Sequence, residues 1–213
     1  MKDRSAEVTR KRYDRLAFVY DLMEGFAERL GFGKWRKALW GKVAGENILE
    51  LGVGTGKNFP YYPVNAEITA IDFSEKMLSR ARDKARKLGV KVCLLPMDVQ
   101  KLDFEDNTFD TVVATFVFCS VPDPLKGLAE VKRVCKPGGK VILLEHVLSA
   151  NRPTACLMNL ANPIVVRLMG ANINRRTVEN VVASGLDVEQ VTDRMAGILK
   201  LVEARKANAH LGR

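Results

Sequence analysis

A glycine-rich stretch follows an apolar run near residue 50. From Ile48 to Pro63 it reads ILELGVGTGKNFPYYP, with Gly52, Gly54 and Gly56 at every second position. Glycines let the backbone approach a ligand closely because they carry no side chain. Asp72 stands 20 residues after Gly52, where a carboxylate can accept hydrogen bonds from both hydroxyls of a ribose. This spacing predicts a site for an adenine nucleoside.

The residues after the glycines indicate which nucleoside. A pyrophosphate needs a helix N-terminus directly after the glycine turn, because its charge rests on the free N–H groups there. Pro60 and Pro63 interrupt the chain within a few residues of Gly56. We therefore expect a ligand without phosphate, S-adenosylmethionine, with its amine within reach of Glu50 or of a carbonyl at the strand end.

The elements that must position these residues alternate between strand and helix patterns. Near-continuous apolar strands separated by helices predict a mostly parallel sheet covered on both faces. The end of the chain adds an antiparallel closing pair. In such sheets the ligand lies at the carboxyl ends of the strands, which selects Asp98, the residues from Thr115 to Ser120, and Glu145 with His146 as well. The predicted strands are 47–53, 67–73, 90–98, 109–118, 140–147, 185–193 and 198–206, with helices at 74–89 and 123–139.

The stretches ILELGVGTGKN, AIDFSEKML, MDVQKLDF, FDTVVATFVFCSVPDP and CKPGGKVILLEH together resemble the class I S-adenosylmethionine-dependent methyltransferases. The resemblance implies an α/β, doubly wound, Rossmann-like fold with a mostly parallel seven-stranded sheet, and the product S-adenosylhomocysteine. It also implies that the glycine loop holds the methionine part, Asp72 the ribose and Asp98 the adenine amine, with Met77 and Val99 bracketing the ring. The expected cofactor residues are Glu50, Gly52, Gly54, Gly56, Asp72, Phe73, Met77, Asp98, Val99 and Thr115.

The residues that could serve the methyl acceptor are less specific. Methyl transfer from a sulfonium is an in-line displacement, so the enzyme mainly orients the acceptor and keeps it in the right protonation state. Tyr13, Tyr20, Tyr61, Tyr62 and His146 could handle the proton of an amine. An isolated histidine beside a strand end is as often structural as catalytic, and a tyrosine that packs its ring is more often structural. The position of His146 at a strand end favours it over Tyr62.

The N-terminal residues 1–43 carry 11 Lys/Arg against 6 acids. Leu16, Val19, Met23, Phe26 and Leu30 share one face of a predicted amphipathic helix. The following KWRKALWGK places Trp35 and Trp40 among basic residues, a pattern suited to an anionic headgroup layer. We expect residues 1–43 to form lid helices that face a membrane, or equally helices that only complete the core, and residues 44–213 to form the cofactor-binding domain.

The tail is also basic, with 9 Lys/Arg against 5 acids in residues 152–213. The stretch from 159 to 186 predicts an apolar helix and then a polar turn with Arg175 and Arg176, whose guanidinium groups suit phosphate oxygens. With YDRLAFVYDLME, FGKWRKALW and the stretch from EHV to NINR, nearly the whole chain resembles bacterial phospholipid N-methyltransferases, which convert phosphatidylethanolamine toward phosphatidylcholine. The resemblance implies a lipid amine near Tyr13, Tyr20 and His146.

Three other functions stay open at this point. Quinone-ring C-methyltransferases share the YD and WR segments but typically carry a GGTGD loop, where this chain has ELGVGTGKN. Small-molecule thiol or amine methyltransferases share the EHV stretch. A noncatalytic or RNA-modifying nucleic-acid binder would explain the net charge of +9, but the aromatic-studded basic groove and the base-methylation motif are missing from the sequence. We expect no nucleic acid as partner.

Composition limits the remaining possibilities. A chain of 213 residues that is 47% hydrophobic suits one compact domain, which we expect to be monomeric. The four cysteines are far apart in the sequence and the chain has two histidines, so neither a metal site nor a disulfide framework is predicted. The N-terminus is too polar for a signal peptide, and no apolar run is long enough to span a membrane. We expect a cytoplasmic protein at the inner face of a membrane.

Overall fold

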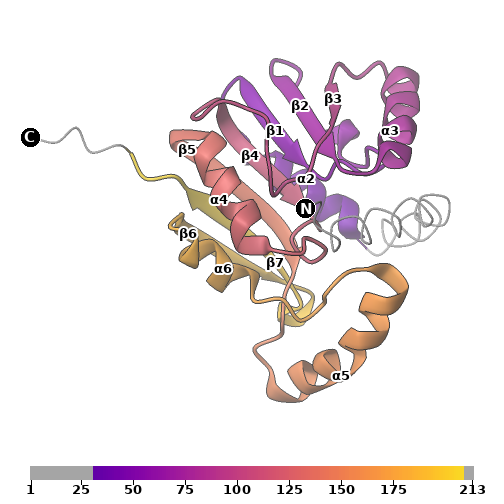
Figure 1. The fold of residues 1–213 in the computed structure, drawn as a ribbon, viewed down its shortest axis with the longest axis vertical. Coiled ribbons are helices and arrows are strands. Elements are labelled where there is room, and N and C mark those ends of the chain that lie inside the picture. The colour runs from indigo at the N-terminus through magenta and orange to yellow at the C-terminus, as the bar shows by residue number, and fades with distance from the viewer. Residues whose placement is uncertain (1–30, 209–213) are drawn as a thin grey trace, which may run out of the picture.

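The computed structural model describes residues 31–208, so the predicted catalytic residues Tyr13 and Tyr20 lie outside the described part of the chain (Figure 1). The centre of the molecule is a seven-stranded sheet with the order β3-β2-β1-β4-β5-β7-β6. Neighbours among the first five strands pair in parallel, and β7 is antiparallel to both β5 and β6. The predicted α/β fold and its antiparallel closing pair are confirmed. The strands are β1 Asn47–Leu51, β2 Glu67–Asp72, β3 Cys93–Pro96, β4 Phe109–Thr115, β5 Cys135–His146, β6 Asp187–Arg194 and β7 Leu199–Arg205.

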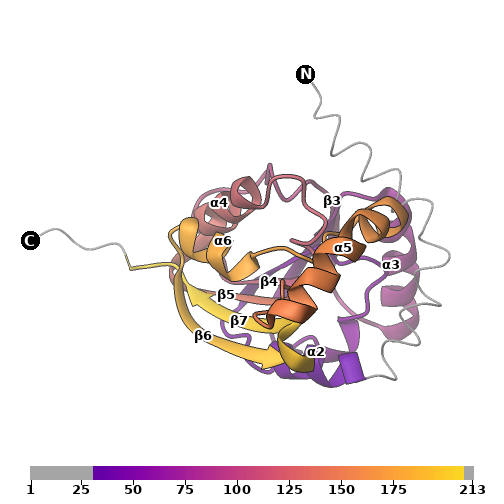
Figure 2. The same cartoon turned by 90° about the horizontal axis from the view of Figure 1, so that it is seen from below.

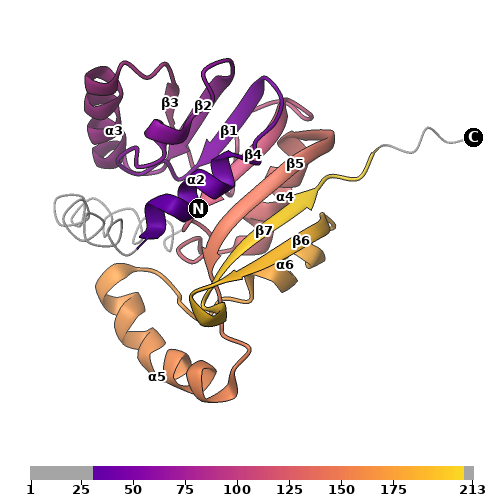
Figure 3. The ribbon, with the colours of Figure 1, turned by 180° about the vertical axis from the view of Figure 1, so that it is seen from behind.

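Helices cover both faces of this sheet. One face packs against α4 and α6, and the other against α2 and α3, as Figures 1 and 3 show from opposite sides. Because successive side chains of a strand point to opposite faces, strands buried on both sides must be apolar throughout. In β1, for example, Leu49 packs toward α4 while Ile48 packs toward α2. The helices are α2 Gly33–Trp40, α3 Glu75–Leu88, α4 Pro124–Val134, α5 Arg152–Met169 and α6 Thr177–Ala183, with short turns η2 Phe59–Tyr61 and η3 Met195–Gly197.

Helix α3 begins and ends at the predicted residues. The hydroxyl oxygen of Ser74 accepts a hydrogen bond from the N–H of Met77 at 3.2 Å, and Gly89 ends the helix in the left-handed conformation. Both are common end signals, because they satisfy backbone groups that the helix leaves unpaired. The Ser74 cap holds Met77 close to the end of β2, where Asp72 lies.

Helix α4 ends earlier than the sequence pattern predicts. The pattern continues to Pro137, but the helix ends at Val134 and β5 already begins at Cys135. A residue that precedes proline avoids the helical region, so Lys136 is extended. The KPGG stretch therefore belongs to the strand and not to a turn after the helix.

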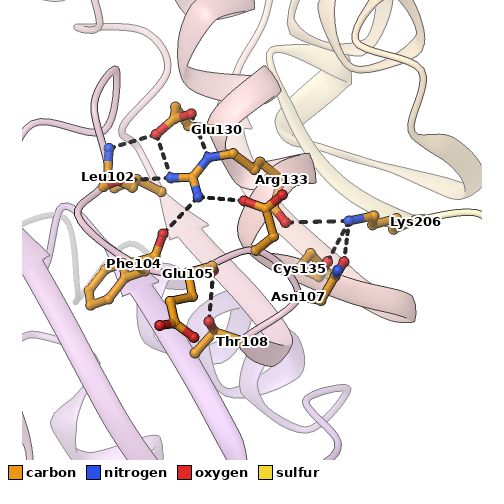
Figure 4. A network of polar contacts seen from close by, with 10 residues as sticks. Leu102, Phe104, Glu105, Asn107, Thr108, Glu130, Arg133, Cys135 and Lys206 are labelled. Carbon is orange, nitrogen blue, oxygen red and sulfur yellow. Dashed lines mark hydrogen bonds and ion pairs between the residues drawn. The ribbon is translucent and has the colours of Figure 1, made fainter.

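Two cations fix the connection between β3 and β4 (Figure 4). The Arg133 guanidinium donates to the carbonyls of Leu102 and Phe104 at 2.8 and 2.7 Å, and its Nε donates to Glu130 at 2.9 Å. Lys206 Nζ donates to Asn107 Oδ1 at 2.7 Å. Glu130 in turn accepts the N–H of Leu102. This network anchors the chain soon after Asp98.

Helix α2 corrects one sequence interpretation. Trp40 is only 4% exposed, and its ring lies 4.5 Å from that of Tyr62. Leu39 is buried beside it, and Trp35 packs against the same core cluster. The hypothesis that Trp40 lies in a lipid headgroup layer is therefore wrong, because its indole belongs to the core on the α2 face of the sheet.

Candidate active site

The glycine loop borders a cavity at the carboxyl ends of β1, β2 and β4. Gly52 and Gly54 both have positive φ, at +61° and +55°. A side chain on Gly52 would overlap Val117, whereas one on Gly54 would meet no atom within 4 Å. The backbone at Gly54 is thus bare toward the cavity, as a ligand that rests on the loop requires.

Most of the predicted cofactor residues meet in this cavity. It lies where the strand order reverses between β1 and β4, the position at which doubly wound sheets bind ligands. The structure adds Gln100 to its wall, and Phe116 and Val117 come from the strand end that the sequence already selected. The predicted residues that line the cavity are Gly52, Gly54, Asp72, Phe73, Met77, Asp98, Val99 and Thr115.

Two carboxylates, Asp72 and Asp98, line the cavity. Asp72 accepts hydrogen bonds from the N–H groups of Gly54 and Ser74, both at 2.9 Å. Asp98 accepts the N–H of Gln100 at 2.9 Å and its Nε2 at 3.1 Å. Gln100 Oε1 also accepts the N–H of Asp123 at 3.0 Å. Gln100 thereby connects Asp98 to the loop before α4, a role that the sequence analysis missed.

Glu50 and Gly56 lie outside the cavity wall. Glu50 is fully buried, and burial raises the pKa of its carboxyl to about 7 against the opposing effect of hydrogen bonds from Tyr62 and Asn58. Asn58 Nδ2 donates to Glu50 at 2.5 Å and to Thr115 Oγ1 at 3.2 Å. A side chain on Gly56 would overlap the Phe59 ring. Gly56 is thus required by packing in this structure, and contact of Glu50 with the cofactor amine stays a prediction.

The two tyrosines after the glycine loop have structural partners. The Tyr62 hydroxyl donates a hydrogen bond to Glu50, and the Tyr62 ring packs on Trp40 and Phe59. Tyr61 packs against the core cluster on the α2 face. The chain after the glycines therefore forms η2 in place of a helix, and Tyr62 holds the buried carboxylate of Glu50.

Phe116 separates the cavity from His146. Phe116 lines the cavity in the left-handed conformation, with φ +60°, which is uncommon outside glycine. The buried Glu145 holds this turn by accepting the N–H groups of Val117 and Phe118 at 2.8 and 3.1 Å. Because strained backbone persists only where its surroundings impose it, Glu145 is a positioning residue for the Phe116 turn.

His146 stacks on the Phe116 ring, with the centroids 4.8 Å apart. Burial lowers the pKa of its imidazole to about 4, so it is neutral at pH 7. A neutral imidazole has one nitrogen that accepts a hydrogen bond. The structure therefore leaves His146 able to accept a proton one ring away from the cavity, and its catalytic role stays a prediction.

The two arginines of the predicted phosphate site diverge. Arg175 donates to the carbonyl of Val121 at 2.8 Å, and burial lowers the pKa of its guanidinium. Arg176 is exposed just before α6. Arg175 thus supports a cavity loop, and phosphate binding by either arginine is a prediction that the structure leaves open.

The cavity fits S-adenosylmethionine. The bare backbone at Gly54 can accept the methionine part, Asp72 lies where ribose hydroxyls would end, and Met77 and Val99 offer apolar surface for an adenine beside Asp98. The connection after the glycine loop is η2, which supplies no long helix for a pyrophosphate. The described residues hold no cluster of His, Cys, Asp and Glu suited to a metal ion.

Comparisons with known proteins agree with this site. A family model described as a methyltransferase domain matches residues 49–143. The phosphatidylethanolamine N-methyltransferase of Cereibacter sphaeroides is 39% identical over 149 residues, which cover 69% of this chain and 72% of that protein. The chain belongs to the class I S-adenosylmethionine-dependent methyltransferases, and S-adenosylmethionine is its methyl donor.

Other relatives have different acceptors. The ubiquinone/menaquinone biosynthesis C-methyltransferase UbiE of Bdellovibrio bacteriovorus is 34% identical over 65% of this chain, which spans 62% of that protein. The thiol S-methyltransferase TMT1B of Rattus norvegicus is 40% identical over 47% of this chain and 42% of that protein. A solved methyltransferase from Aquifex aeolicus has a TM-score of 0.58 and 25% identity, covering 79% of this chain and 86% of that chain.

Proposed function

We propose that this methyltransferase transfers methyl groups to the amine of phosphatidylethanolamine, and to its mono- and dimethyl forms, toward phosphatidylcholine. The observation that carries the proposal is the similarity to the phosphatidylethanolamine N-methyltransferase of Cereibacter sphaeroides, which extends over 72% of that protein. The matches to UbiE of Bdellovibrio bacteriovorus and to TMT1B of Rattus norvegicus cover smaller shares of those proteins, 62% and 42%.

The aromatic cluster beside the cavity supports an amine acceptor. The Phe32 ring lies 4.9 Å from that of Trp35 and 5.4 Å from that of Phe116, which in turn stacks on His146. Aromatic faces attract ammonium groups, and the attraction grows when water is excluded. His146 is neutral, whereas the Arg36 guanidinium already lies over the Phe116 ring, 5.5 Å from its centroid. The rings of Phe32 and Trp35 therefore carry this argument. The cluster therefore suits an amine that gains methyl groups stepwise.

The residues of the chain have three tasks in this reaction. When bound, S-adenosylmethionine supplies an electrophilic methyl group on a sulfonium. Gly54 and Asp72 orient the donor, while the Phe116 turn, held by Glu145, shields the acceptor from water. The amine must lose a proton before it attacks, and His146 or water accepts it. Tyr13 and Tyr20 belong to the same proposal as further groups near the amine.

We also propose that the enzyme acts at the cytoplasmic face of a membrane as a peripheral protein. Among the residues that the structure describes, no helix has the length and apolar character to cross a bilayer. The excess of basic residues at the two ends of the chain favours an anionic lipid surface.

Product analysis tests the proposal. The protein is incubated with S-adenosylmethionine labelled in the methyl group and, in parallel, with phosphatidylethanolamine in mixed micelles, a demethylated quinol and a small alkyl thiol. We expect label in mono-, di- and trimethylated phosphatidylethanolamine. Label in the quinol ring or in the thiol, with none in the lipid, would contradict the lipid acceptor and support the corresponding relative.

A further inference from the structure

Helix α5 presents a continuous apolar stripe to solvent. Leu157, Leu160, Ile164 and Leu168 are 67%, 76%, 63% and 67% exposed. Their spacing of three and four residues places them on one face of the helix, and Cys156 is exposed next to Leu157. Figures 1 and 3 show α5 at one end of the molecule, apart from the layers formed by the sheet and its other helices. We call the four residues the α5 stripe.

The polar side of α5 is tied to the loop that follows it. Asn162 Oδ1 accepts the N–H of Ile173 at 2.9 Å, and Asn159 Oδ1 accepts a hydrogen bond from Asn174 Nδ2 at 2.9 Å. These bonds fix the rotation of the helix about its axis. The α5 stripe therefore faces outward because its opposite side is bonded.

The same loop connects α5 to the cavity. Asn172 donates to the Cys119 carbonyl through its N–H at 2.8 Å and through Nδ2 at 3.3 Å. Cys119 lies between Val117 and Ser120, which both line the cavity. Figure 2 views the molecule from the end where α5 lies, with α5 in front of the sheet. The loop that holds α5 is thus bonded to a segment of the cavity wall.

The charges around the stripe are of one sign. Between Glu145 and Glu179 the sequence contains four arginines and no acid. Arg152 at the start of α5, Arg167 in its last turn and Arg176 in the following loop are exposed. An apolar stripe bordered by arginines is complementary to an anionic bilayer, because acyl chains receive the leucines and headgroups receive the guanidinium groups.

We propose that α5 is the membrane-docking helix of this enzyme. It lies in the plane of the anionic headgroup layer with the α5 stripe at the acyl boundary, and it turns the cavity mouth toward the lipid. The inference rests on the proposed lipid acceptor for its purpose but on the exposed stripe and its arginines for its evidence. It replaces the contact predicted for Trp40, which is buried, whereas the predicted amphipathic helix from Leu16 to Leu30 lies outside the described residues.

A fluorescent label tests the position of the stripe. Cys93 and Cys156 are exposed, whereas Cys119 and Cys135 are buried. An environment-sensitive dye is attached to Cys156 in a Cys93→Ser variant, and vesicles of phosphatidylglycerol and phosphatidylethanolamine are added. We expect a blue shift and higher intensity, because the dye enters an apolar layer. No change on vesicle addition would overturn the proposal.

The matched control places the dye on Cys93 in a Cys156→Ser variant. Cys93 begins β3, whose other end leads to the cavity residues Met97 and Asp98, so this dye should stay in water. A shift of equal size at Cys93 would indicate adhesion without orientation and would also overturn the proposal. So would apolar emission from Cys156 before vesicles are added, because the stripe would then be covered by protein.

A second variant removes the stripe. Leu160→Ser/Ile164→Ser should weaken vesicle binding by about tenfold or more, since two apolar side chains no longer enter the acyl boundary. Both residues are largely exposed, so the free energy of unfolding should hardly change. The control is Leu88→Ser/Val182→Ser, which alters exposed residues near the ends of α3 and α6. Equal vesicle binding by the two double variants would contradict docking through α5.

These experiments can contradict the proposed lipid acceptor and the proposed docking surface independently of each other. Methylation of phosphatidylethanolamine in detergent micelles reports the acceptor without a bilayer. A Cys156 shift with vesicles but no methylated lipid in micelles would support docking and contradict the proposed function. Methylated lipid without a Cys156 shift would support the function and overturn docking by α5.

Discussion

Two fully buried carboxylates lie near the ends of β1 and β5, the strands on either side of β4, and each has its own partners. Glu50 receives hydrogen bonds from the side chains of Asn58 and Tyr62, whereas Glu145 receives backbone N–H groups on one oxygen. The other oxygen of Glu145 has no partner among the described residues. Burial raises the pKa of both carboxyls to about 7. Both residues therefore destabilise the fold when they ionise, and the glycine loop and the Phe116 turn depend on them.

This cost predicts a pH-dependent effect of Glu50→Gln. A carboxyl with a pKa raised from 4.5 to about 7 in the folded state binds its proton more tightly there than in the unfolded chain. Its contribution to stability is present below pH 4.5 and is lost as the pH rises through 7. The wild-type protein should therefore lose up to about 3 kcal/mol relative to the Glu50→Gln variant between pH 4.5 and pH 8.

Denaturant unfolding of both proteins at several pH values measures this difference. Glutamine cannot make all the hydrogen bonds of Glu50, and this loss changes the free energy of unfolding by an amount that does not depend on pH. The test is therefore how the difference between the two proteins changes with pH. Glu67→Gln, at an exposed position of β2, should give a flat difference and serves as the control. A flat difference for Glu50→Gln as well would show that Glu50 keeps the same affinity for its proton in both states.

His146→Phe separates catalysis from stacking. Phenylalanine keeps an aromatic ring against Phe116 but removes the nitrogen that can accept a proton. If His146 takes the amine proton, kcat should fall about a hundredfold, the lower end for a general base, while calorimetry should give the wild-type Kd for S-adenosylmethionine. Because the pKa of His146 is about 4, wild-type activity should show no histidine titration between pH 5.5 and 8. Unchanged kcat in the variant would assign His146 a structural role.

At the scale of elements, the turn from β1 into η2 contains two glycines, Gly54 and Gly56, that are required for different reasons. Gly54→Ala would place a methyl group in open space at the cavity, whereas Gly56→Ala would place it 2.3 Å from the Phe59 ring. Both positions have positive φ, so each substitution adds backbone strain of about 1 kcal/mol. We expect Gly54→Ala mainly to weaken cofactor binding. Gly56→Ala should mainly lower the free energy of unfolding, because overpacking against Phe59 adds a further loss of about 1–3 kcal/mol.

Calorimetry with S-adenosylmethionine and urea unfolding measure the two effects on the same variants. Gly89→Ala at the end of α3 is the control for strain alone, because its φ is +66° and its side chain would also meet open space. It should lose stability as Gly54→Ala does and bind the cofactor normally. If Gly56→Ala were as stable as Gly89→Ala, the contact with Phe59 would not be what requires glycine at position 56.

The sequence predicts elements well where the signals are local. The Ser74 cap and Gly89 define α3, and the apolar runs define the strands within a few residues, because each depends on neighbours along the chain. The sequence left a membrane position and a core position open for Trp40, because a basic amphipathic pattern has the same appearance on a membrane and on a sheet. The first turns of α5 also lay outside the predicted helix, although Asn151 caps it by accepting the N–H of Thr154.

In the candidate site, too, the sequence predicts what depends on strand ends and misses what depends on contacts between distant residues. Residues at strand ends, such as Asp72 and Thr115, could be predicted because the topology brings those ends together. The partners of Glu50 could not, since Asn58 connects it to Thr115, 57 residues away from Asn58 in the sequence. The left-handed Phe116 is set by the distant Glu145 and carries no local signal. Contacts between distant segments therefore limit what sequence patterns show of this site.

At the scale of the whole molecule, charge and apolar surface are separated. The central residues 44–151 are neutral, with 14 Lys/Arg against 14 acids, and the excess lies at the two ends of the chain. The α5 stripe and its arginines belong to the C-terminal excess. Membrane binding through α5 should thus have an electrostatic contribution from the arginines, which salt screens, and an apolar contribution from the α5 stripe, which salt does not screen.

Salt and charge variants can separate these parts. The screening length falls from about 10 Å at 0.1 M salt to about 3 Å at 1 M, so binding to anionic vesicles should weaken and the remainder should come from the α5 stripe. Arg152→Gln and Arg167→Gln should each cost about 1 kcal/mol on anionic vesicles at low salt, and nothing on neutral ones. Lys87→Gln, at an exposed position in the last turn of α3, is the matched loss of charge far from α5 and should bind as the wild type does. If Lys87→Gln weakened binding as much as Arg152→Gln, the net charge of the protein would govern adsorption, and α5 would not set the orientation in which the active site meets its lipid.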